Sequence, residues 1–167
     1  NYTDDFQKRY PNLCGTVQNF NVEDSIRAGL KLFPGAKHVV ILVDSTPAGR
    51  RFESQLKEKL PSFEGIDITY FSDSSEGPSA ILEKIRKLPK DTLFVLTPWR
   101  GLYHTNYRQT ATAFGIDLLR AAGRPYLVCE DSLFGAGALG GFMVTAEDQA
   151  KEAASVIRTV FDSGGTK

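Results

Sequence analysis

The stretch His38-Val39-Val40-Ile41-Leu42-Val43 decides the fold class of this chain. It is short, rich in β-branched residues and uninterrupted by polar side chains after His38. A continuous apolar strand of this kind is expected where helices cover both faces of a parallel sheet. The stretch therefore predicts a buried strand of an α/β sheet.

Helical patterns stand on both sides of this strand. Asn21, followed three residues later by Asp24, is typical of a helix N-cap, and apolar residues then recur at helical spacing. After the strand, Pro47 marks the first turn of a second helix, with Ser45 or Thr46 as its cap. The strand is thus expected to lie between two helices.

The same alternation continues along the chain. Further strands are expected at 66–71, 92–97 and 125–129, and a glycine-rich stretch then reaches a fifth apolar run at 141–144. Helices are expected to begin at Pro78, to end before Gly123 and to begin after Thr145. The last of these helices is expected to turn four apolar residues inward, namely Ala150, Ala153, Ile157 and Phe161.

Five strands alternating with five helices predict a doubly wound, mostly parallel five-stranded sheet in the flavodoxin-like order 2-1-3-4-5. Residues 1–20 fit neither pattern and are expected to form a connecting segment that arrives from elsewhere. Residues 21–167 are then one α/β ligand-binding lobe.

Composition excludes several classes of function. The chain has 20 basic and 20 acidic residues, whereas a nucleic-acid-binding domain normally has a basic excess. Its two cysteines, Cys14 and Cys129, are too few for a disulfide scaffold of 167 residues. We expect two free and mostly buried thiols, with a single structural bridge as the alternative.

A ligand site is expected outside the carboxyl ends of the strands, where open α/β sheets bind their ligands. After the first buried strand, Asp44, Ser45 and Thr46 place hydroxyls and backbone N–H groups at a helix N-terminus. This arrangement favours an anionic or carbonyl group of a ligand. The alternative is that Ser45 or Thr46 only caps the helix.

Two further loops supply candidate ligand-binding residues. Trp99, Arg100 and Tyr103 suit a planar or carboxylate ligand, which they would hold by stacking and bidentate hydrogen bonds, or they pack against a partner lobe or subunit. Asp131, with Phe134 beside it, follows the fourth strand. Its carboxylate would accept hydrogen bonds from a ligand amine or hydroxyl, or would cap a turn.

The other motifs of the sequence do not indicate a cofactor or metal site. Residues 135–140 match the dinucleotide fingerprint G-x-G-x-x-G, but they lie in the last β-α unit and no helix follows directly. His38 and His104 fall at opposite ends of the sheet, and Cys14 and Cys129 are equally scattered, so no metal-ligand spacing exists. We therefore expect no cofactor, no metal and no catalytic set.

Four stretches resemble one known family: 16–33, 39–49, 125–141, and Gln149 with Ala153-Ala154. Together the chain resembles the carboxyl-side lobe of the type I periplasmic-binding fold. More narrowly, it is similar to the substrate-binding proteins of ABC transporters and to the related sensor portions of bacterial histidine kinases. The resemblance implies that Thr46, Trp99 and Asp131 face a ligand cleft between two lobes.

The same resemblance implies a non-catalytic, periplasmic or extracytoplasmic receptor that is tethered to the inner membrane in the full-length protein. The implied partners are a small-molecule ligand, a second lobe of the receptor or a homodimer mate, and a membrane kinase or permease. Two alternatives from other classes stay open. One is a small hydrolase using Asp44 or Asp131, and the other is a flavodoxin-like cofactor-binding domain.

Overall fold

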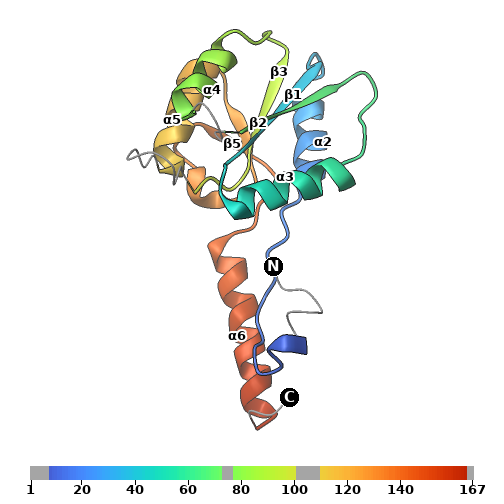
Figure 1. Ribbon diagram of the computed structural model, residues 1–167, viewed down its shortest axis with the longest axis vertical. Helices are drawn as coiled ribbons and strands as arrows, with labels where there is room; N and C mark the ends of the chain where they lie inside the picture. Colours follow the sequence, from blue (N-terminus) through green and yellow to red (C-terminus); the bar gives the residue numbers. More distant parts are fainter. Residues whose placement is uncertain (1–7, 73–76, 101–109, 165–167) are drawn as a thin grey trace. The chain divides into compact units, whose positions relative to one another are not determined.

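The computed structural model describes residues 8–72, 77–100 and 110–164, and its backbone divides into two compact units (Figure 1). Residues 21–143 form one unit, here called the sheet unit. Residues 1–20 and 144–167 form the other, here called the terminal unit. The sheet unit starts at residue 21, and the last helix, which the sequence analysis counts with the lobe, belongs to the terminal unit.

The sheet unit contains a five-stranded, all-parallel sheet in the order β2-β1-β3-β4-β5, as the sequence predicts. Its strands are β1 (His38–Val43), β2 (Asp67–Ser72), β3 (Thr92–Leu96), β4 (Tyr126–Val128) and β5 (Ala138–Gly140). Strand β1 lies between β2 and β3, pairing from His38 with Thr92 to Leu42 with Leu96. The strand order reverses between β1 and β3.

The fifth strand lies earlier than expected, inside the glycine-rich stretch rather than at 141–144. Ala138 pairs with Tyr126 and Gly140 with Leu127, and the register shifts between the two pairs. Because β5 is an edge strand, it needs no continuous apolar run of the kind that defines β1. The apolar run at 141–144 therefore did not mark the position of the fifth strand.

Helices cover both faces of the sheet, as Figure 1 shows. The sheet unit contains α2 (Val22–Leu32), α3 (Pro47–Lys59), α4 (Gly77–Arg86), α5 (Ala111–Ala122) and the short 3₁₀ turn η1 (Asp131–Leu133). Asn21 Oδ1 accepts a hydrogen bond from Asp24 N at 3.0 Å, so the expected cap of α2 is present.

The strand side chains alternate between the two covered faces. Val40 and Leu42 of β1 belong to a core with Phe94 of β3 and with apolar residues of α4 and α5. On the other face, α2 comes close enough that a Cβ at Gly29 would lie 2.6 Å from side-chain carbons of Leu93 and of Leu127. Burial on both faces explains why β1 carries no polar alternation.

The terminal unit contains α6 (Ala146–Asp162), which begins at the expected cap: Thr145 Oγ1 accepts from Asp148 N at 3.0 Å. The expectation that its apolar side chains turn inward is wrong. None of its residues is buried, and Phe161 is 79% exposed. The spacing of apolar residues predicts that a helix has an apolar face, but not whether that face has a partner.

The cysteines test one smaller expectation. Both cysteines are free, but only Cys129 is buried, whereas Cys14 lies exposed in the terminal unit. Within the described ranges, no helix combines the length and the apolar character that crossing a bilayer requires.

Candidate functional site

The point where the strand order reverses, between β1 and β3, is where a doubly wound sheet opens a crevice at its carboxyl edge. The loop after β1 starts at Asp44, and the loop after β3 runs through Thr97 to Arg100. Strand β4 ends beside β3, and Glu130 and Asp131 follow it. The site is therefore built from the first residues after three neighbouring strands.

Asp44 is the most buried carboxylate of this edge, with 1% of its surface exposed. Its Oδ1 accepts hydrogen bonds from Thr46 N at 3.1 Å and from Thr46 Oγ1 at 2.6 Å. Its Oδ2 accepts from Arg100 N at 2.6 Å. One carboxylate thus ties the loop after β1 to the loop after β3.

The first turn of α3 is shaped around this carboxylate. Thr46 caps the helix by accepting from Gly49 N at 3.1 Å, and Pro47 takes the first helical position. A Cβ at residue 49 would lie 2.1 Å from Asp44 Oδ1 and 2.3 Å from Asp44 O, so only glycine fits there. Ser45 is also buried, and its carbonyl accepts a hydrogen bond from the Arg50 guanidinium.

Thr97 fixes the start of the loop after β3, and sequence reasoning did not single it out. Its N–H donates to Leu42 O at 3.1 Å and its Oγ1 donates to the same oxygen at 2.8 Å. Thr97 therefore extends the pairing of β3 with β1 by one residue. A threonine that ends a buried apolar run is the feature that could have indicated this role.

The structure places Trp99 in the hydrophobic core rather than on the open edge. Its side chain is 2% exposed and stacks on Phe114 of α5, with ring centroids 3.9 Å apart and planes 1° from parallel. Burial of so large an aromatic surface stabilises the fold more than exposure in a loop would. Its Nε1 is buried with no hydrogen-bond partner among the described residues.

Arg100, directly after Trp99, is exposed and reaches toward the loop after β4. Its Nη2 lies 4.0 Å from Glu130 Oε2, whose side chain is only 13% exposed. Glu130 Oε1 also accepts from Ser132 Oγ at 3.2 Å. An exposed guanidinium and a largely buried carboxylate therefore stand side by side across β3 and β4.

Glu130 is a functional candidate that the sequence did not single out, although it directly precedes Asp131. Burial, and second the charge of Glu130, raise the pKa of the neighbouring Cys129 thiol to about 12. That thiol stays protonated at neutral pH and is therefore unreactive. The feature that could have indicated Glu130 is its position as the first acid after a buried strand.

The structure describes two of the three remaining candidate residues. Asp131 is half-buried and begins η1, where its carbonyl accepts from Phe134 N at 3.2 Å. The ring of Phe134 is exposed at the same loop. Tyr103 lies outside the described residues. The structure thus brings Asp44, Ser45, Thr46 and Arg100 together, and Asp131 and Phe134 into the adjacent loop.

The chemistry of this edge is that of polar recognition. The donor is the exposed Arg100 guanidinium, and the acceptors are the Glu130 and Asp131 carboxylates. Among the described residues, no group of three or more His, Cys, Asp or Glu side chains is placed to hold a metal ion.

Comparison with known proteins gives no family for the chain: no protein-family model matches it, and no curated protein matches its sequence.

Proposed function

We propose that the sheet unit is a non-catalytic lobe of an extracytoplasmic receptor, and that it binds a small polar molecule at the carboxyl edge of its sheet. The proposal depends on how polar side chains are placed where the strand order reverses. There the buried carboxylate of Asp44 joins two loops, and Arg100 and Glu130 stand at the rim, 4.0 Å apart.

This arrangement supports binding because its rim groups are held by a rigid base. The backbone of Arg100 is fixed by Asp44, so the guanidinium extends from a defined point. Preorganised polar groups cost less conformational entropy when a ligand binds than mobile ones do. A ligand with an anionic group for Arg100 and a donor for Glu130 fits this pair best.

Asp44 has a structural role in this proposal. Both of its oxygens are engaged by the chain itself, through Thr46 and Arg100. We therefore assign it no chemical step, and the proposed lobe releases its ligand unchanged. A second lobe of the same receptor, or a second copy of the chain, supplies the opposite wall, and closure transmits occupancy to a membrane kinase or permease.

Thermal unfolding of the full-length protein tests the proposal. The melting temperature is measured with single amino acids, sugars, organic acids and nucleosides, each in large excess. A ligand present at a hundred times its Kd stabilises the folded state by about 2.7 kcal/mol. At least one compound should raise the melting temperature of the wild type, and Arg100→Ala should reduce that rise.

Arg120→Ala is the matched control, because Arg120 is an exposed arginine of α5 whose ion pair within the described ranges is with Asp117. The ligand should raise the melting temperature of this variant as much as it raises that of the wild type. A panel without any stabilising compound, or a rise that Arg100→Ala leaves intact, would count against the proposed site.

A further inference from the structure

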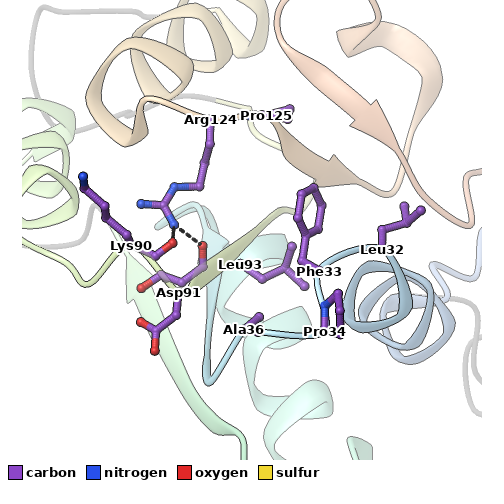
Figure 2. A pocket seen from close by; sticks show the side chains of 11 residues that line it. Leu32, Phe33, Pro34, Ala36, Lys90, Asp91, Leu93, Arg124 and Pro125 are labelled. Carbon is purple, nitrogen blue, oxygen red and sulfur yellow. Dashed lines mark hydrogen bonds between the residues drawn. The ribbon is translucent and has the colours of Figure 1, made fainter.

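A hollow lies at the opposite edge of the sheet, where the strands begin. It has a volume of about 480 Å³ and is lined by the end of α2, the start of β3 and the residues before β4 (Figure 2). Small-molecule sites commonly have volumes of about 300–1,000 Å³. Because all five strands are parallel, this amino-edge pocket is separated from Asp44 by the length of β1.

One side of the amino-edge pocket is apolar. Leu32 and Phe33 end α2, and both are exposed, Leu32 by 63%. The other apolar side chains of the lining are Pro34, Ala36, Leu93 of β3 and Pro125. Figure 2 shows the Phe33 ring and the Leu32 side chain together on one side of the pocket. Covering such surface with an apolar group removes it from water and is therefore favourable.

The other side is cationic and rigidly held. The Arg124 guanidinium donates from Nε to Ala122 O at 3.2 Å, and from Nη1 to Thr92 O at 3.1 Å and to Lys90 O. These carbonyls fix the guanidinium in place but do not neutralise its charge. No carboxylate of the described residues lies within 4.0 Å of it, and Nη2 has no acceptor among them.

The other charges around the pocket also favour an anionic ligand. Lys90 lines it with a second cationic, exposed side chain. The acidic side chain in the lining is Asp91, whose Oδ1 lies 4.0 Å from His38 Nε2. Figure 2 shows the Asp91 carboxylate directed away from the Arg124 guanidinium. The free donor of Arg124 is thus left for an anion.

We propose that the amino-edge pocket binds a small amphipathic carboxylate, with its apolar body against Phe33, Leu32 and Leu93 and its carboxylate on Nη2 of Arg124. Arginine suits this group because its planar fork matches the geometry of a carboxylate. The site is independent of the proposed receptor site, since the two share no residue.

Phenylacetate, titrated into the ¹⁵N-labelled protein, tests the proposal, with phenylacetamide as the neutral compound of the same shape. Phenylacetate should shift the amide resonances of Phe33, Leu93 and Arg124 in a saturable way. Phenylacetamide should bind at least ten times more weakly, because it has no charge for the guanidinium. Phe33→Ala should weaken phenylacetate binding at least fivefold.

Phe134→Ala is the matched control, because Phe134 is also an exposed phenylalanine but lies at the carboxyl edge. It should bind phenylacetate as the wild type does. Lys90→Gln, an exposed substitution, should weaken binding of phenylacetate but not of phenylacetamide. Equal shifts with both compounds, shifts scattered over the surface, or no effect of Phe33→Ala would overturn the proposal.

Discussion

Asp44 Oδ2 accepts a hydrogen bond from the backbone N–H of Arg100 at 2.6 Å, across 56 positions of sequence. Because the same carboxylate also holds Thr46 through its N–H and its hydroxyl, it joins the two loops at the reversal of strand order. The rim of the proposed ligand site therefore depends on one buried side chain that does not itself face solvent.

Replacing this carboxylate tests how much the junction contributes to stability. Asp44→Asn keeps the size of the side chain but turns one acceptor into a donor, so at least one of its three bound groups loses its partner. The free energy of unfolding should fall by about 1–3 kcal/mol in urea denaturation. Asp67→Asn is the control, because Asp67 is exposed, and it should change stability by less than about 0.5 kcal/mol.

The close fit of Gly49 to Asp44 gives a second prediction. In Gly49→Ala, the new Cβ collides with the carbonyl and the carboxylate of Asp44, so the start of α3 has to move. We expect a loss of about 1–3 kcal/mol of stability. Gly35→Ala is the matched control, since nothing lies within 4 Å of a Cβ at residue 35. Similar losses in the two variants would contradict the described junction.

The position of Trp99 gives a third prediction, which fluorescence can check because Trp99 is the only tryptophan. Iodide should hardly quench the native emission, and should quench it strongly after unfolding, because the indole is buried against Phe114. Phe114→Leu removes the stacked ring and should cost about 1–3 kcal/mol. Strong native quenching would place the indole on the surface instead.

The pKa of Cys129 predicts loss of stability in alkali. Burial, and second the Glu130 charge, raise it to about 12 in the folded protein from 9.0. An unfolded thiol ionises near pH 9 while the folded one stays protonated, so stability is full below that pH and is lost as the pH rises toward 12. The loss is at most about 4 kcal/mol.

Urea denaturation at several pH values measures this effect. Cys129→Ala should flatten the decline between pH 9 and 12 in part only, because burial also raises the pKa of Tyr126 to about 12. Cys14→Ala, which changes the exposed cysteine, should leave the slope unchanged. An unchanged slope in Cys129→Ala would show that this thiol is not the group responsible.

The sequence predicted those parts of the fold that local chemistry determines. The apolar run 38–43 identified β1, the Asn21 and Thr145 caps located α2 and α6, and the alternation of elements indicated the sheet order. These features are predictive because a helix cap or a buried strand is recognised from residues that are close together in the sequence.

Contacts between distant segments could not be predicted in the same way. The residues around Trp99 favour a loop, and only its packing on Phe114 shows that the ring is core. Phe161 lies on an apolar helix face, yet the face is exposed. Nor does the sequence indicate that Asp44 binds Arg100 or that Arg100 approaches Glu130, because each contact joins loops that follow different strands.

Amide chemical-shift mapping of a compound that raises the melting temperature locates the proposed receptor site. The account predicts that the shifts concentrate at the loops after β1, β3 and β4, with Thr46, Gly49, Arg100 and Glu130 among the amides that move. Shifts confined to the amino edge around Phe33 and Arg124, or to α6, with those four amides unmoved, would contradict it.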